Sequence, residues 1–135
     1  MHLEGQCNCE GVHYQYDGEP DVVGFCHCKA CQRQAGGSGS IFICVDDGDL
    51  KITGDTIKKY ITRADSGLDV NRFFCGTCGS PIVSRCVGFP GKAFIKAGTL
   101  NDTSMLNPTV EVWCEEAQPW MPQIPGVDRF ERGPA

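Results

Sequence analysis

The chain has 135 residues, ten of them cysteine, and its length fits a single domain over residues 1–135. No apolar run is long enough to span a membrane, and the first residues lack the basic and apolar segments of a secretory signal peptide. We therefore expect a cytoplasmic protein, where clustered cysteines bind metal or do redox chemistry rather than form disulfides. Twelve Lys and Arg against 17 Asp and Glu give a formal net charge of -5, which makes nucleic acid an unlikely partner.

Short runs of β-branched and aromatic residues follow one another along the chain, separated by Gly, Asp and Asn. We expect strands over residues 12–16, 21–25, 40–45, 50–53, 57–62, 70–74, 81–87, 93–97 and 109–113. Gly54-Asp55, between two of these runs, predicts a hairpin. No window has a sustained helical period, so helix is limited to a turn or two. The pattern predicts an all-β domain of about eight or nine strands.

Two segments lack a strand pattern. Residues 36–40 consist of Gly and Ser and predict a mobile loop. Residues 118–125 contain three prolines, which cannot donate to a β-ladder. We expect this second segment to lie across the sheet with Trp120 as its anchor.

Seven cysteines fall into three tight groups, of which two predict a closed metal site. Cys75-x-x-Cys78 is bounded by glycine, which lets the backbone curl until both thiolates reach one tetrahedral ion. Cys7-x-Cys9 on a strand places two further thiolates on one face. Together the four predict a structural zinc. A redox CxxC is the alternative, but the thioredoxin type expects a βαβ context that this sequence lacks.

Cys26, Cys28 and Cys31 form the third group and leave a fourth ligand position open. Zinc sites with three protein ligands and an open position are catalytic, so this group predicts a catalytic zinc. His27 stands between two cysteines that share a face, and on an extended backbone it points away from the metal, toward surrounding groups or solvent. The alternative is a second structural zinc, with its fourth ligand drawn from His27, Cys44, Cys86 and Cys114.

Cys44, Cys86 and Cys114 each lie in a strand-like run. Free cysteine is among the most buried residue types and packs as a small hydrophobe. We therefore expect these three thiols to be buried side chains without a further function.

Three cysteine-bearing segments resemble the glutathione-dependent formaldehyde-activating enzyme family, which also includes centromere protein V. They read CNCEGV at residues 7–12, FCHCKACQRQAG at 25–36 and FCGTCGSPI at 74–82, and the similarity runs from Gly5 to about Phe130. The resemblance implies an all-β, β-tent fold with two zinc ions. It places the structural zinc on Cys7, Cys9, Cys75 and Cys78, and the second zinc on Cys26, Cys28 and Cys31.

For function, the resemblance implies a carbon–sulfur lyase that interconverts S-hydroxymethylglutathione with glutathione and formaldehyde. Glutathione carries carboxylates, which need cations, and Lys29 and Arg33 beside the third group are candidates. Ser38 in the glycine loop is a candidate donor to the substrate backbone. Arg72 and Arg85 flank the Cys75–Cys78 knuckle, where we expect them to screen thiolate charge.

Two other functions are open on the sequence. One is a non-catalytic zinc module that binds a protein or nucleic-acid partner, which the centromere relative implies and the acidic charge of this chain disfavours. The other is a zinc lyase or hydrolase that uses a different thiol or small electrophile. Three thiolates around Zn²⁺ carry one net negative charge, which suits activation of a sulfur nucleophile better than polarisation of a carbonyl.

Overall fold

The structure, a computed structural model, describes residues 1–133, which form two β-sheets and one short α-helix, α1 (Lys29–Ala35). The smaller sheet has the order β1-β2-β5 and consists of β1 (His2–Gln6), β2 (His13–Asp17) and β5 (Leu50–Thr53). The larger sheet has the order β11-β10-β3-β4-β9-β8-β7-β6. Its strands are β3 (Val22–Cys26), β4 (Ser40–Asp46), β6 (Ile57–Arg63), β7 (Asp69–Cys75), β8 (Pro81–Cys86), β9 (Lys92–Lys96), β10 (Val110–Val112) and β11 (Asp128–Arg129).

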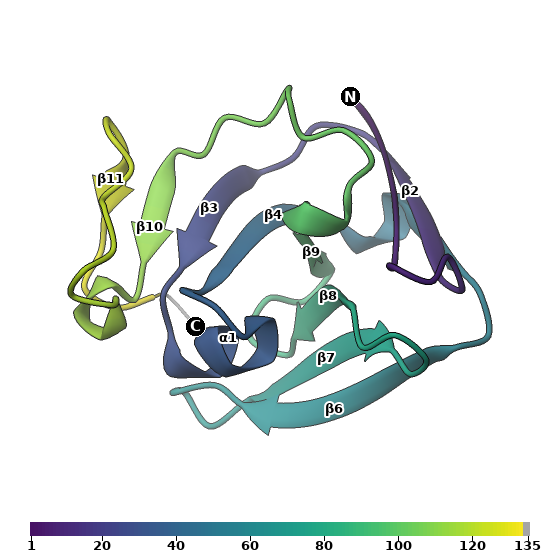
Figure 1. The fold of residues 1–135 in the computed structure, drawn as a ribbon, viewed down its shortest axis with the longest axis horizontal. Coiled ribbons are helices and arrows are strands. Elements are labelled where there is room, and N and C mark those ends of the chain that lie inside the picture. The colour runs from purple at the N-terminus through teal and green to yellow at the C-terminus, as the bar shows by residue number, and fades with distance from the viewer. Residues whose placement is uncertain (134–135) are drawn as a thin grey trace.

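The all-β prediction is confirmed, with eleven strands within residues 1–133 in place of about eight or nine. The two strands that the pattern missed are β1, whose only large apolar residue is Leu3, and the two-residue β11. The described part of the chain also has three single turns of 3-10 helix: η1 (Asp47–Asp49), η2 (Ala97–Thr99) and η3 (Cys114–Glu116). In Figure 1, β1 and β2 lie at one end of the molecule, β10 and β11 at the other, and α1 lies between β3 and the β6–β7 pair.

The larger sheet has two faces with different roles, because successive side chains of a strand point to opposite sides. One face packs against the smaller sheet and forms a single hydrophobic core. Its contributors from the larger sheet include Val23, Ile43, Val45, Val83 and Ile95, and those from the smaller sheet include Leu3, Tyr14, Tyr16 and Leu50. Full burial of an aliphatic side chain contributes about 1.5–3 kcal/mol, so this face stabilises the fold. The other face is left for the site described below.

The predicted hairpin at Gly54-Asp55 is wrong. β5 pairs with β2 in the smaller sheet, whereas β6 pairs with β7 at the edge of the larger one. The connection between them therefore crosses from one sheet to the other. Gly54 makes the crossing with a φ of +118°, and a Cβ there would come within 2.1 Å of the Gly11 carbonyl oxygen. The glycine that suggests a tight turn instead permits close approach to a neighbouring loop.

Trp120 is also not the anchor expected of it, because its side chain is 70% exposed. Two neighbours hold this segment instead. Met121 Sδ accepts a hydrogen bond from the Ser38 hydroxyl, and the Ile124 N–H donates to Glu111. Within residues 1–133, no helix has both the length and the apolar character needed to cross a bilayer.

Candidate functional site

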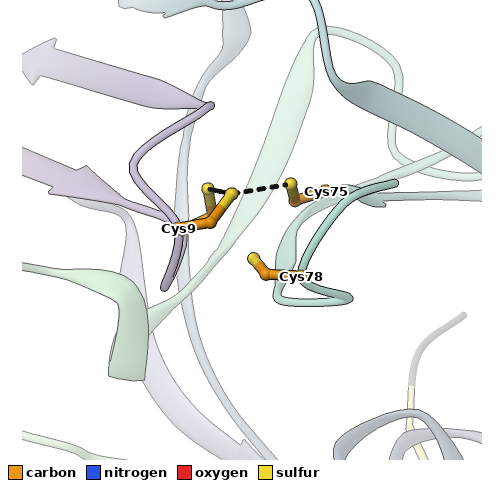
Figure 2. A group of neighbouring side chains, drawn as sticks. Cys9, Cys75 and Cys78 are labelled. Carbon is orange, nitrogen blue, oxygen red and sulfur yellow. Dashed lines mark hydrogen bonds between the residues drawn. The ribbon is translucent and has the colours of Figure 1, made fainter.

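The four cysteines predicted for the closed site lie together. Cys7 and Cys9 come from the turn after β1 rather than from a strand, while Cys75 ends β7 and Cys78 follows in the next turn. Figure 2 shows Cys9, Cys75 and Cys78 pointing toward one another. The Cys9 sulfur is 3.6 Å from the Cys7 sulfur and 3.6 Å from the Cys75 sulfur, and all four sulfurs lie within 4.8 Å of one another.

This closed cluster fits a tetrahedral metal ion. Metal–sulfur bonds of about 2.3 Å separate tetrahedral sulfur ligands by about 3.8 Å, close to the spacing found here. The N–H of Val12 donates to Cys7 Sγ at 3.2 Å and that of Thr77 to Cys75 Sγ at 3.4 Å. The Ser80 hydroxyl lowers the pKa of Cys78 to about 5. The donors to Cys75 and Cys78 favour thiolates at those two positions, the form in which cysteine binds metal.

The three cysteines predicted for the open site also lie together, with their sulfurs within 4.8 Å of one another. Cys26 ends β3, and Cys28 caps α1 by accepting a hydrogen bond from the Cys31 N–H at 3.3 Å. Within residues 1–133 no fourth His, Cys, Asp or Glu belongs to this open cluster. The residues weighed as a fourth ligand, His27, Cys44, Cys86 and Cys114, therefore stand outside it.

His27 is buried, so of its two expected surroundings the structure has neighbouring side chains rather than solvent. Its Nε2 lies 2.8 Å from Oε1 of Glu111, a carboxylate with 1% of its side chain exposed. Glu111 also accepts hydrogen bonds from Arg129 and from the Ile124 N–H. The residue between two cysteines of the open cluster is thus tied to β10. Nothing in the local sequence around Glu111 marks it, because its partner is 84 residues away.

A cavity of about 1110 Å³ adjoins the open cluster on the face of the larger sheet that does not form the core. Its floor comes from even-numbered positions of neighbouring strands, since these point to the same side. The floor residues are Val22 and Cys26 of β3, Ser40, Phe42 and Cys44 of β4, Phe94 and Lys96 of β9, Ser84 and Cys86 of β8, Val70 and Arg72 of β7, and Val110 and Val112 of β10. Valine, phenylalanine and cysteine account for nine of these thirteen residues.

Two buried cations lie in this floor, and the sequence pattern did not place either one here. Lys96 Nζ donates to the Ser40 hydroxyl at 3.1 Å, and Arg72 Nη1 donates to Gln34 Oε1 of α1 at 2.8 Å. Neither cation forms an ion pair with a carboxylate within residues 1–133. Burial lowers the pKa of Lys96, and the nearby thiols oppose that shift. Hydrogen bonds from the other two cluster thiols lower the pKa of Cys31, and the two cations lower it further.

Comparison with known proteins identifies the family of the chain. The family model described as glutathione-dependent formaldehyde-activating enzyme matches residues 2–116. The chain belongs to this family. A crystal structure of a Rhodobacter sphaeroides protein has the same fold, with a TM-score of 0.59 and 19% sequence identity over 78% of this chain and 91% of that one. No curated protein matches the sequence.

In this member of the glutathione-dependent formaldehyde-activating enzyme family, three predicted substrate contacts occupy different surroundings. Lys29 lies at the cavity rim, where its Nζ donates to Gln32 Oε1 at 3.1 Å. Arg33 is exposed on α1, and the Ser38 hydroxyl donates to Met121 Sδ at 3.2 Å. The cavity lining includes neither Arg33 nor Ser38. Their roles as substrate contacts stay predictions.

The remaining predictions concern arginines and single cysteines. Arg72 lines the cavity of the open cluster rather than screening the knuckle, and Arg85 pairs with Asp47 at 2.9 Å. Cys44 is buried as predicted, and burial raises the pKa of its thiol to about 11. Cys86 and Cys114 are half-buried. Both Cys44 and Cys86 line the cavity as thiols whose raised pKa values favour the neutral form.

Charged residues gather at the mouth of the cavity. Arg132 pairs with Asp65 of the β6–β7 turn and, at 3.2 Å, with Glu115 of η3. Its guanidinium lies 4.7 Å from the centre of the Trp113 ring. Arg132 thereby links the β6–β7 turn to the segment after β10, and both of these contribute to the cavity lining. The mouth thus carries charged side chains of both signs, whereas the floor is apolar apart from two serines and the two buried cations.

Proposed function

We propose that this protein is a zinc-dependent carbon–sulfur lyase that adds the thiol of glutathione reversibly to an aldehyde, with formaldehyde as the simplest case. One observation carries the proposal: a three-cysteine cluster without a fourth ligand from residues 1–133 borders a cavity that holds two buried cations without carboxylate partners. The family description, which names glutathione and formaldehyde, supports the choice of thiol and of carbonyl compound.

Two zinc ions per chain belong to this proposal. The closed cluster would hold a structural ion through four thiolates, which complete a tetrahedron. The open cluster, Cys26, Cys28 and Cys31, would hold a catalytic ion, whose free position favours the thiolate form of a bound thiol at neutral pH. His27 and Glu111 would fix the backbone between two of these ligands, as partners behind metal ligands do elsewhere.

The remaining steps fall to side chains of the floor. In the addition direction the sulfur bonds to the carbonyl carbon, the C=O π bond breaks, and the thiol proton ends on the oxygen. Negative charge develops on that oxygen, and a preorganised donor in a water-poor site stabilises it most. The ammonium group of Lys96 meets these conditions, since it keeps N–H donors beyond the one used by Ser40. Arg72 adds a second positive charge that, like that of Lys96, lowers the pKa of Cys31.

The decisive assay follows free formaldehyde after mixing with glutathione, with and without zinc-loaded protein. A rate above the spontaneous reaction that is lost in Cys31→Ser supports the proposal. The absence of any added rate from protein with two zinc ions per chain would overturn the named activity. The measurement also has to include the reverse reaction, started from S-hydroxymethylglutathione, because a lyase accelerates both directions by the same factor.

The proposal includes a cytoplasmic location and one domain over residues 1–135. All ten cysteines are free thiols in the structure. Both the seven metal-ligating thiolates and the glutathione co-substrate need the reducing conditions of that compartment.

A further inference from the structure

The cavity is far larger than a one-carbon aldehyde requires. Pockets of about 300–1,000 Å³ enclose drug-sized ligands, and this one measures about 1110 Å³. Four phenylalanines line it, and three of them are half-buried and in edge-to-face contact: Phe94 lies 5.7 Å from Phe42 and 5.4 Å from Phe89, between ring centres. The fourth, Phe130, is more exposed. Because these rings also line the cavity, a further apolar group can pack against them there.

Glutathione alone does not account for this floor. The tripeptide is polar, with two carboxylates and an amine, and suits the charged part of the lining, which consists of Arg63, Asp65, Glu116, Glu131 and Arg132. The phenylalanine floor offers it no partners for hydrogen bonds. The cavity therefore has a polar part that fits the thiol and an apolar part that fits something else.

The charges of the site indicate that this second component is neutral. Three thiolates with a divalent ion carry one negative charge, and Lys96 and Arg72 together carry two positive charges. The site without substrate thus has one positive charge in excess, which a single substrate thiolate neutralises. A further anion would restore an uncompensated buried charge, which is costly.

On the basis of the proposed function, we propose that the carbonyl substrate is an aromatic aldehyde, whose ring lies on Phe42, Phe89 and Phe94. The product is the hemithioacetal of that aldehyde with the thiol: one S–C bond forms, the C=O π bond breaks, and the thiol proton ends on the oxygen. No oxidant or reductant takes part. Formaldehyde is then a small substrate that leaves most of the floor unused.

Stable thioethers test this substrate class by binding alone. S-benzylglutathione carries the ring of a benzaldehyde adduct without its labile hydroxyl, and S-methylglutathione is the one-carbon counterpart. Calorimetric titration of zinc-loaded protein should show that S-benzylglutathione binds at least about tenfold more tightly than S-methylglutathione, because the benzyl ring is buried in the cavity. Phe94→Leu should reduce this preference. Tyr60 is an aromatic residue of β6 that is 64% exposed and lies outside the cavity, so Tyr60→Leu should leave the preference for S-benzylglutathione unchanged.

Equal affinity for the two thioethers, or a preference that survives in both Phe94→Leu and Phe42→Leu, would overturn the aromatic assignment while leaving the formaldehyde assay to decide the proposed function. If neither thioether binds, the assignment of glutathione is wrong. The affinities of benzyl mercaptan and ethanethiol for the zinc-loaded protein are then compared instead. Tighter binding of benzyl mercaptan then supports the aromatic cavity, and equal binding overturns it. Circular dichroism shows whether each leucine variant is folded before it is titrated.

Discussion

The ammonium group of Lys96 lies 3.1 Å from the hydroxyl of Ser40, and Ser40 is the β4 residue that pairs in register with Cys26. A buried cation on β9 is thus connected, through one hydrogen bond and one strand pairing, to the first cysteine of the open cluster. Backbone register fixes this relationship, so the cation keeps its place beside the thiolates without a carboxylate partner from residues 1–133.

Replacing Lys96 by Met should separate activity from stability. The change removes the donor proposed for the developing oxyanion, and the loss of one such donor lowers kcat by about 10²–10³-fold. The melting temperature should stay equal or rise, because an apolar side chain of similar length replaces a buried charge. Lys51→Met, at an exposed position of β5, is the matched control for the loss of a lysine. An unchanged kcat in Lys96→Met with zinc still bound would contradict the proposed role.

The two cysteine clusters should differ in what their loss does to the fold. Cys28→Ser should reduce zinc from two ions per chain to one while the protein stays folded, since the serine hydroxyl can replace the Cys28 sulfur as the cap of α1. Cys75→Ser should prevent folding, because closure of a structural zinc site contributes on the order of 10 kcal/mol. Metal analysis together with thermal melting measures both. Equal destabilisation by the two variants would show that the open cluster is also structural.

The spacing of the cysteines was enough to predict both clusters, because two ligands of each lie within a few residues and local geometry brings them together. Strand alternation likewise predicted the β-class. The sequence pattern could not predict which distant strands pair with one another, as the wrong hairpin at Gly54 shows. Lys96 and Glu111 were missed for the same reason: their burial depends on partners 56 and 84 residues away, and an isolated lysine or glutamate in a sequence is ordinarily at the surface.

Glu111→Gln should change how stability depends on pH. Burial raises the pKa of Glu111, but the hydrogen bonds from His27 and Arg129 outweigh it and hold that pKa below 4.5. A carboxyl with a depressed pKa stabilises the fold above the pKa of the unfolded chain, and this contribution is lost as the pH falls through the folded-state pKa. The variant should be less stable at pH 7 by about 1.5–3 kcal/mol, the value of a hydrogen bond to a charged group.

The difference between the two proteins should shrink as the pH falls below 4.5, because Glu111 then binds a proton first in the unfolded chain and, at lower pH, in the folded wild type as well. Urea unfolding of both at a series of pH values, each with the same excess of zinc, measures this difference. A constant difference from pH 7 down to the acid limit would rule out the charge of Glu111 as its source.

Gly24→Ala should damage the cavity floor. A Cβ at this position would lie 2.6 Å from Val110 Cγ2 and 2.8 Å from Phe42 Cζ, with the Val110 carbonyl oxygen at 3.0 Å. The ring and strand β10 must move, at a cost of about 1–3 kcal/mol. Urea unfolding checks the stability, and Gly48→Ala, which meets no atom within 4 Å, is the control. If both variants are equally stable, the floor is more pliable than its contacts indicate.

The larger sheet distributes two tasks over alternate positions of the same strands. In β4, Ile43 and Val45 belong to the core while Ser40, Phe42 and Cys44 line the cavity. Substrate selectivity and fold stability therefore depend on different residues, which alternate along the same strand. A combinatorial library confined to the cavity-lining positions could retune what the protein accepts and leave intact the half of the sheet that holds it together. An insertion or deletion of one residue within a strand would exchange the two sets and destroy both at once.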